Sequence, residues 1–453
     1  MKILKEQYLK TGRVFLIIVF FELFYSAGNA QQKTEFLSLK EAVDAVVSNN
    51  TAVQSAGIDE AIAREKYKQT NAGFLPQVNF SYSALATDNP LNVFGFKLQQ
   101  RMVTAADFNP EKLNHPTGTS DFTTKIEALQ PLLNMDAVYM KKSAQVQVES
   151  FQLKTKRTKE YLVYETQKAY RQLQMAHQSI AVLEEALATA KSIYDFTSNR
   201  VKQGLIQKSD LLNVEVQVLG IETNLNEAKS NLLNASDYLS VLMNKPAGVL
   251  YHTEEMKQES SIEKTEVNIP KNRTDFLAME KMIEATGLML QSSRMKYLPR
   301  LNAFGSYQLN DKRLAGFHAG SYMAGIQLTW NVFDGNNIRR QVTGLKLEQD
   351  KLKVQLHSMQ QENQMLLDKG YRDLANTIFK IKQQNAAIAQ ADEALRILQN
   401  RYEEGLVNTT DVLTAQTQLS QQKLLLVQAI YSNRITQDYI QFLTTATDIN
   451  NQN

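Results

Sequence analysis

Residues 199–212 read NRVKQGLIQKSDLL, and residues 400–413 read NRYEEGLVNTTDVL. Six of the fourteen positions are identical, and each stretch lies between two long segments with the apolar periodicity of helices. Each stretch therefore predicts the end of one helix, a tight turn and the start of another helix. Because the two copies are 201 residues apart, they indicate an internal duplication, and the chain divides into two similar halves.

The residues of both stretches suit such turns. Gly204 and Gly405 fit the left-handed backbone position that follows the last residue of a helix. Side chains that can cap the next helix follow in each copy: Ser209 or Asp210 in the first, and Thr410 or Asp411 in the second. An ordinary helical hairpin explains either copy alone, so the argument for a larger architecture rests on the duplication.

The composition is that of a globular protein and excludes several functional classes. Of the 453 residues, 43% are apolar and 21% are charged, and the net charge of +3 is too small for a nucleic-acid-binding protein. The chain has no cysteine, which excludes disulfides, thiol catalysis and an acylated N-terminal cysteine.

Residues 1–30 have the features of an export signal. Four basic side chains precede an apolar run at residues 14–24, and Gly28 and Ala30 supply the small residues of a cleavage site. The run is too short to span a membrane as a helix, and no later stretch approaches the roughly eighteen apolar residues that this requires. We therefore expect residues 1–30 to be a signal peptide and the mature protein to be exported.

Each half is predicted to contain a helix, a hairpin of two strands, a long helix and a shorter helix. The first half, residues 31–245, places these elements at 38–72, 78–84 with 122–128, 135–202 and 209–244. The second half, residues 274–453, places them at 274–296, 301–309 with 322–330, 336–403 and 410–445. Residues 246–273, which include Pro246 and Pro270, are expected to form an equatorial linker between the halves. Residues 87–120 and 311–320 are expected to be surface loops on the extracellular side.

The strands alternate apolar and polar side chains. In the second strand Phe122, Ile126 and Ala128 oppose Lys125 and Glu127. Four strands with an apolar outer face are not a stable unit in water, and in lipid a sheet cannot leave open edges, because each unpaired backbone group costs several kcal/mol. At about ten residues, the strands have the length of tilted membrane strands. Several chains must therefore close one barrel, and we expect Lys125 and Glu127 to face its lumen.

The number of chains follows from the number of strands. Two chains supply eight strands, whose interior is filled by side chains, whereas three supply twelve, which leave a channel. Each long helix measures roughly 100 Å at 1.5 Å per residue, and the shorter helices stacked end to end match it. The predicted fold class is mainly α with a small membrane β part: a trimeric twelve-stranded β-barrel that continues into a long periplasmic α-helical coiled-coil barrel.

These features resemble the TolC family of outer-membrane export channels. The resemblance rests on the duplicated turns, on Phe74-Leu75-Pro76 and Tyr297-Leu298-Pro299 before the strands, and on the strand-to-helix junctions at 130–134 and 330–335. It covers the mature chain. It implies a homotrimer in outer-membrane lipid that extends into the periplasm and receives cargo from an inner-membrane pump through a periplasmic adaptor protein. The implied function is a passive duct for efflux or type I secretion, gated at its periplasmic tip.

The resemblance also assigns residues to the tip. It implies that Tyr402 bonds to Asp210 and holds the gate closed, and that Asp411 belongs to a ring of carboxylates that favours cations. The adaptor is expected to contact six turn residues: Gly204, Leu205, Ile206, Gly405, Leu406 and Val407. Because Val407 replaces an arginine that adds a second tie in the family, the resemblance predicts fewer ties in the closed state. Asp210 and Asp411 also suit simple helix caps, and this alternative stays open.

The sequence shows no constellation for catalysis or metal binding. The five histidines lack metal-ligand spacing, and no phosphate-binding loop of the GxxxxGK type is present. We therefore expect no enzyme activity, cofactor, metal or nucleic-acid partner. The alternative from another class is a periplasmic coiled-coil tether or scaffold without a duct, which explains the helices and the signal but not the two strand hairpins.

We predict that the signal peptide is removed after Ala30, so that the mature protein begins at Gln31 without a lipid anchor. Mass spectrometry of the protein purified from cell envelopes should give the mass of residues 31–453. A mass that includes the first 30 residues would contradict the export signal.

Overall fold

The structure, a computed structural model, describes residues 33–256 and 268–446. The predicted signal peptide, its cleavage site and the middle of the predicted linker lie outside the described residues. The chain forms two compact units. Unit 1 contains the described residues of 33–55, 157–270 and 362–446, and unit 2 contains residues 56–156 and 271–361. Each unit draws on both predicted halves, because the long helices α6 (Met135–Lys202) and α9 (Asn337–Glu403) contribute to both units.

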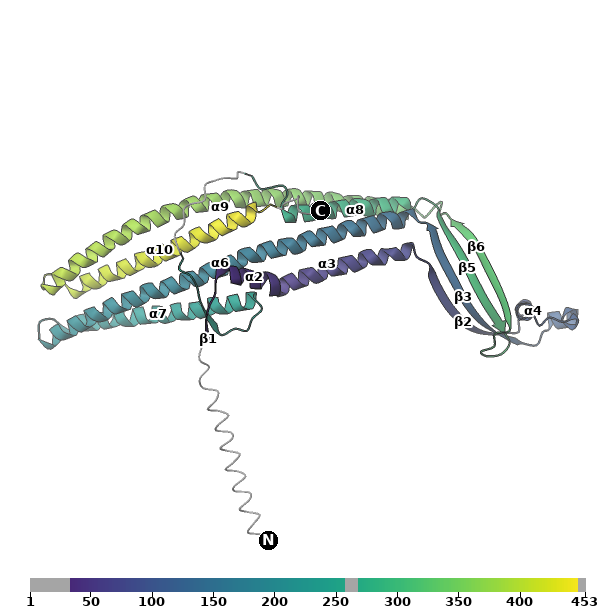
Figure 1. Ribbon diagram of the computed structural model, residues 1–453, viewed down its shortest axis with the longest axis horizontal. Coiled ribbons are helices and arrows are strands. Elements are labelled where there is room, and N and C mark those ends of the chain that lie inside the picture. Colours follow the sequence, from purple (N-terminus) through teal and green to yellow (C-terminus); the bar gives the residue numbers. More distant parts are fainter. Residues whose placement is uncertain (1–32, 257–267, 447–453) are drawn as a thin grey trace, which may run out of the picture. The chain divides into compact units, whose positions relative to one another are not determined.

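Unit 2 contains an antiparallel sheet of four strands in the order β2-β3-β5-β6 (Figure 1). The bounds of these strands are β2 (Gln77–Thr87), β3 (Thr119–Leu133), β5 (Arg300–Asp311) and β6 (Ala319–Thr329). Both predicted hairpins are therefore present, and β3 and β5 join them into one sheet. Among the described residues, β2 and β6 pair on one side only, so the sheet has two open edges.

The strand register places apolar side chains on one face of the sheet and polar side chains on the other. One row across the strands is Phe80, Ile126, Tyr307 and Tyr322, and these side chains are between 50% and 84% exposed. The next row is Ser81, Lys125, Gln308 and Ser321. The alternation predicted from each strand thus continues across these rows, so one face of the sheet is mainly apolar and the other mainly polar.

Phe304 is one exception to this alternation, since it lies on the polar face between Asn302 and Ser306. Its partner across β6 is Gly325, and a side chain at that position would begin only 3.0 Å from the Phe304 ring. The glycine leaves room for the ring to lie flat across the neighbouring strand. An aromatic side chain covering a strand glycine in this way stabilises both strands.

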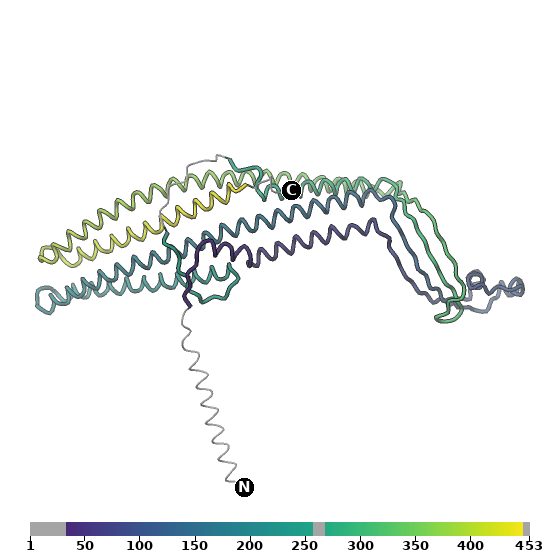
Figure 2. Tube along the Cα trace, in the orientation of Figure 1, coloured from purple at the N-terminus to yellow at the C-terminus, as the bar shows by residue number. Residues whose placement is uncertain are grey.

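The connection between β2 and β3, predicted as a surface loop at 87–120, is a folded segment with three short helices (Figure 2). These are α4 (Pro90–Gln99), η2 (Ala105–Phe108) and α5 (Pro110–Asn114). Asn89 and Asn109 cap α4 and α5, and each is followed by a proline that suits the first helical position. The two Asn-Pro pairs in the segment predicted as a loop thus start helices.

A small set of contacts holds this connection together. Lys97 forms an ion pair with Asp107 at 2.7 Å, and the rings of Phe94 and Phe108 pack edge to face with centroids 5.7 Å apart. The bond from Lys97, together with bonds from the Thr104 amide and hydroxyl, holds the pKa of the Asp107 carboxyl well below its usual range. Val93 is buried beneath these groups. The segment therefore has a core and caps of its own.

The helical part of unit 2 contains most of α3 (Thr51–Gln69), α8 (Thr274–Met295) and the first parts of α6 and α9. Buried serines bring α6 and α8 close together: Ser143 donates to the Ala285 carbonyl at 2.7 Å, and Ser150 donates to the Ala278 carbonyl at 2.8 Å. The spacing of seven residues places both serines on one face of α6. None of the described helices is long and apolar enough to cross a membrane.

The helix predicted at 38–72 is divided, because Asn50 interrupts it. α2 (Leu39–Asn49) ends at Asn50, whose backbone is extended, and α3 begins at the next residue. The Asn50 side chain is buried; its amide nitrogen donates to the Leu242 carbonyl and its oxygen accepts from the Ala52 amide, both at 2.8 Å. This side chain fixes the break, so the prediction of one continuous helix was wrong here.

Unit 1 contains the remaining parts of α6 and α9 together with α7 (Lys208–Leu242) and α10 (Thr409–Thr444). It also contains a two-stranded parallel sheet of β1 (Lys33–Phe36) and β4 (Val249–His252), which was not predicted. Tyr170 of α6 lies under these strands and is 1% exposed, and its hydroxyl donates to the Leu37 carbonyl at 2.9 Å. This bond attaches the chain before α2 to the long helix.

We predict that Tyr170→Phe lowers the free energy of unfolding by about 0.5–1.5 kcal/mol, the contribution of one buried hydrogen bond. A lower midpoint of thermal unfolding in detergent should report this loss. Since the phenylalanine ring fills the same space, helix content should stay unchanged. An unaltered midpoint would contradict the importance of this bond.

Candidate functional site

Both duplicated turns lie in unit 1, where each joins a long helix to a shorter one (Figure 1). As predicted, Gly204 and Gly405 adopt left-handed conformations, with φ of +71° and +77°. In the first turn the Leu205 amide donates to the Arg200 carbonyl at 2.9 Å and the glycine amide donates to the Val201 carbonyl at 2.9 Å. The second turn repeats both bonds. This pair of bonds ends a helix and reverses the chain at once.

The next helices begin earlier than predicted. The N-cap residues, which have extended backbones, are Gln207 and Asn408. The predicted caps were wrong, because the two glycine-centred bonds reverse the chain so sharply that only a few residues separate the helices. The predicted capping residues already lie inside the first turn of the next helix: Ser209 and Asp210 in α7, and Thr410 and Asp411 in α10. Asp411 instead accepts a bond from the Asn408 amide at 3.2 Å. Both aspartates lie in the first helical turn, where a negative charge is favourable.

Tyr402 connects the two hairpins beneath the turns. Its side chain is 5% exposed, and its hydroxyl lies 2.9 Å from the hydroxyl of Thr197 on α6 and 2.9 Å from that of Thr409 on α10. Both threonines are buried. The three hydroxyl groups therefore satisfy one another in a site from which water is excluded. Among the described residues the hydroxyl of Tyr402 has no bond to Asp210, so this expectation was wrong.

Arg200 adds a second connection, which was not predicted. Its guanidinium donates to the Glu403 carbonyl at 2.5 Å. The same group lies over the ring of Phe196 at 4.7 Å and over the ring of Tyr402 at 5.6 Å. An arginine from the first copy of the motif thus holds the backbone of the second copy. The expectation of fewer ties, based on Val407, was therefore incomplete.

An apolar cluster lies behind these polar ties. Its buried members come from all four helices of the two hairpins: Ile193, Val214, Leu395, Tyr402, Val412, Leu413 and Leu419. The tips of the hairpins are therefore packed together as one body, rather than joined by surface hydrogen bonds alone.

The outermost residues of the turns have a different character. Leu205 is 66% exposed and Leu406 is 69% exposed, each directly after its glycine, while Ile206 and Val407 are partly buried. Leucines at this position commonly pack against the preceding helix turn. Here each turn instead leaves one apolar side chain in solvent.

Lys125 and Glu127 lie on the polar face of the sheet, next to each other along β3. Their side chains form an ion pair at 3.2 Å. The neighbours of this pair across the strands are Ser81, Gln308 and Ser306, all on the same face. That face can therefore line an aqueous space, whereas the opposite face cannot.

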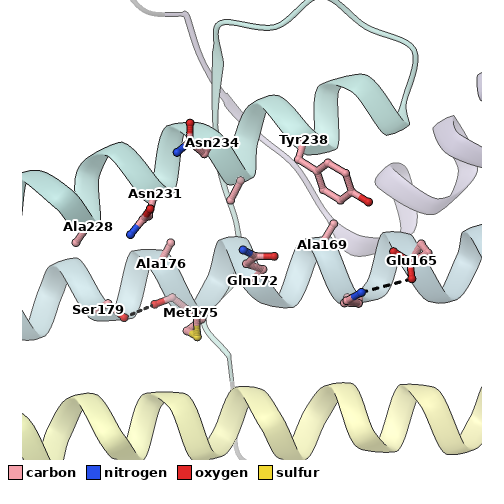
Figure 3. A pocket seen from close by; sticks show the side chains of 12 residues that line it. Glu165, Ala169, Gln172, Met175, Ala176, Ser179, Ala228, Asn231, Asn234 and Tyr238 are labelled. Atoms are coloured by element: carbon pink, nitrogen blue, oxygen red, sulfur yellow. Dashed lines mark hydrogen bonds and ion pairs between the residues drawn. The ribbon is translucent and has the colours of Figure 1, made fainter.

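A groove of about 630 Å³ lies between α6 and α7 in unit 1 (Figure 3). Asn231, Asn234 and Tyr238 line it from α7, and Gln172 lines it from α6. No nucleophile with an adjacent base is found among the described residues around it. In the described part of the chain, no three His, Cys, Asp or Glu side chains are grouped to hold a metal ion. The groove offers polar surface but no catalytic arrangement.

The sequence matches the outer membrane efflux protein family over residues 42–245 and 268–444, which is most of the chain. The chain belongs to this family. As an outer membrane efflux protein, it is located in the outer membrane and extends into the periplasm. It is similar to nodulation protein T of Rhizobium leguminosarum bv. viciae, with 21% identity over 338 residues that cover 72% of this chain and 69% of that protein.

Solved structures of outer-membrane channels have the same fold as this efflux protein. The structure of CusC, described in connection with transmembrane channel formation, has a TM-score of 0.76 at 16% identity and covers 92% of this chain and 95% of its own. The CmeC outer membrane channel of Campylobacter jejuni has a TM-score of 0.75 at 17% identity and covers 90% and 85%. The predicted fold class, mainly α with a small membrane β part, is thereby confirmed.

We predict that Tyr402→Phe loosens the tip of this efflux protein, because two buried threonine hydroxyls lose their partner. Hydrogen-deuterium exchange of peptides around residues 197–203 and 402–409 should become faster. Tyr194→Phe is the control, since the ring of Tyr194 packs against the same cluster. Equal exchange in wild type and Tyr402→Phe would show that the hydroxyl network does not hold the tip.

Proposed function

We propose that this protein is the outer-membrane subunit of a tripartite efflux or type I secretion system, and that three copies form a passive duct across the outer membrane and periplasm. The observation that carries the proposal is the four-stranded sheet. It combines a mainly apolar face, a mainly polar face and two open edges, a combination that suits a closed barrel in lipid.

Three copies are favoured over two because of the space inside the resulting barrel. Twelve strands leave a lumen, whereas eight strands are filled by interior side chains. Lys125 and Glu127 are proposed to face that lumen, since a charge that faces lipid at the membrane midplane costs about 2–4 kcal/mol. The residues of the apolar row, such as Phe80 and Tyr322, are proposed to contact lipid.

The helices of the three copies are proposed to continue the barrel as a tunnel in the periplasm. The two turns then lie at its far end, where the exposed Leu205 and Leu406 meet a periplasmic adaptor protein. That adaptor is proposed to connect the duct to an inner-membrane pump. The internal repeats at 31–245 and 274–453 are proposed to give each copy two equivalent hairpins for these contacts.

The tip is proposed to be the gate. A wide duct that stayed open would breach the envelope, so the hairpins must close it at rest. We propose that Tyr402 with its two threonines, together with Arg200, stabilises the closed arrangement within each copy. Asp411 and Asp210, which occupy equivalent positions in their helices, are proposed to contribute negative charge at the constriction in addition to their effect on the helix starts.

A tether or scaffold without a duct is less well supported, because it does not explain a four-stranded sheet with an exposed apolar face. Extraction from membranes separates the two proposals. A duct should be recovered from outer membranes in detergent as a trimer that dissociates on heating, whereas a tether should be released without detergent as a soluble rod.

We predict that Tyr402→Phe combined with Arg200→Ala increases the single-channel conductance of trimers in planar bilayers. Each lost hydrogen bond removes about 0.5–1.5 kcal/mol of stabilisation, and the loss is repeated in three copies, so the balance between closed and open states shifts by orders of magnitude. Tyr194→Phe should leave the conductance unchanged. Folded double-variant trimers with the conductance of wild type would eliminate the assignment of the gate.

We also predict that Asp411→Ala reduces the preference of the channel for cations, because three carboxylates are removed from the constriction. The measurement is the reversal potential in a salt gradient. Asp411→Asn, which keeps a side chain that can accept the bond from the Asn408 amide, separates charge from capping. If Asp411→Asn retains the cation preference of wild type, Asp411 serves only the helix start.

A further inference from the structure

The folded connection between β2 and β3 is attached to the sheet by a buried polar network. Gln100, at the end of α4, donates from its amide nitrogen to the Asp121 carboxylate at 2.8 Å and to the Ser120 carbonyl at 2.9 Å. Asn310 of β5 donates to the same carboxylate at 3.0 Å, and Thr123 donates to it at 2.6 Å. Gln100, Asp121 and Asn310 are each 1% exposed.

Burial of the Asp121 carboxylate costs solvation free energy, so this network depends on the donors that surround the carboxylate. A buried carboxylate without a cationic partner is stabilised only by the donors around it, and here three side chains supply them. A separate bond from Arg101 to the Gly320 carbonyl, at 2.7 Å, fastens the same segment to β6. The end of α4 is thus connected to β3, β5 and β6.

The strand register shows on which face of the sheet this attachment lies. Side chains two residues apart in a strand share a face, so Asp121, Thr123, Lys125 and Glu127 all point to the same side. Gln100 contacts Asp121 and therefore covers the polar face, at the end of the sheet remote from the helices. The apolar face is not covered in this way, since Phe80, Ile126 and Tyr322 stay exposed.

We infer that this segment, residues 88–118, forms a second constriction at the outer mouth of the duct, with Asp121 as the residue that positions it. The inference rests on the proposed function, since it requires the polar face to line a lumen. It assigns size selection to the outer mouth as well as to the periplasmic tip.

The dimensions support an effective constriction. With strands about 4.8 Å apart and tilted by about 40°, a twelve-stranded barrel has a backbone diameter of about 24 Å. An α-helix with its side chains is about 10–12 Å across, so three helix ends over the polar face occupy most of that opening. The Lys97–Asp107 ion pair and the Phe94–Phe108 contact make the segment a body that can obstruct, rather than a loose loop.

The absence of cysteine allows a direct test on intact cells. Lys125→Cys places a single thiol on the polar face below the network. A small, charged methanethiosulfonate should label this thiol from outside, whereas a maleimide carrying a polyethylene glycol chain should label it slowly. Adding Gln100→Ala should raise the rate of the second reaction by about ten-fold or more, as expected for the loss of a bond to a charged group. Gln99→Ala, a change at the exposed neighbouring residue, should leave both rates unchanged.

The outcomes separate this inference from the proposed function. If the small reagent fails to label Lys125→Cys in folded trimers, the polar face does not line a duct and the proposed function fails. If the small reagent labels it but the large reagent reacts equally fast with and without Gln100→Ala, the outer constriction is overturned. Asp121→Asn, which keeps the shape of the side chain and removes its charge, should give the same acceleration as Gln100→Ala. An unchanged rate in Asp121→Asn would overturn the role of its carboxylate.

Discussion

The open edges of the sheet are the constraint on which the rest of the structure depends. β2 has 11 residues and β6 has 11 residues, and in the described chain each pairs on one side only. An unpaired backbone group in lipid costs several kcal/mol, whereas each side-chain bond at the tip contributes about 0.5–3 kcal/mol. In the proposed barrel, edge pairing between copies therefore outweighs each local interaction described above. The roles proposed for the helices, the turns and the segment at 88–118 therefore all require that the edges of the sheet are closed.

The large elements were predictable because their signals are local and repeated. Helical periodicity predicted α6 at 135–202, which the structure confirms, and alternation predicted both hairpins of the sheet. The errors occur where a single side chain overrides the pattern. Asn50 divides one predicted helix through bonds to Leu242 and Ala52, the first of which is a contact that no local pattern contains. Similarly, Asn89 and Asn109 could start a helix or a turn, and contacts distant in sequence, the Lys97–Asp107 ion pair and the packing of Phe94 on Phe108, favour the helices.

The tip was predictable in its backbone but not in its contacts. Left-handed glycines follow from chain geometry alone, so Gly204 and Gly405 were placed correctly. The partner of Tyr402 depends on how two helices are rotated about their axes, and one residue changes the direction of a side chain by about 100°. This rotation brings Thr197 and Thr409 to the hydroxyl instead of Asp210. Both copies of the motif begin with Asn-Arg, and this shared pair could have indicated a structural role for Arg200.

The chemistry of these contacts bears on how the proposed gate opens. Phenol and threonine hydroxyls are uncharged near neutral pH, and an arginine keeps its charge, so no carboxylate needs to be ionised for the ties of Tyr402 and Arg200 to form. Protonation of carboxylates therefore does not by itself remove the ties of Tyr402 and Arg200. A ligand shifts such a balance only if it binds the two states with different affinity. Leu205 and Leu406 are exposed next to the turning glycines of the two hairpins. If the proposed gate opens by separation of these hairpins, a partner protein bound to the two leucines could supply that difference.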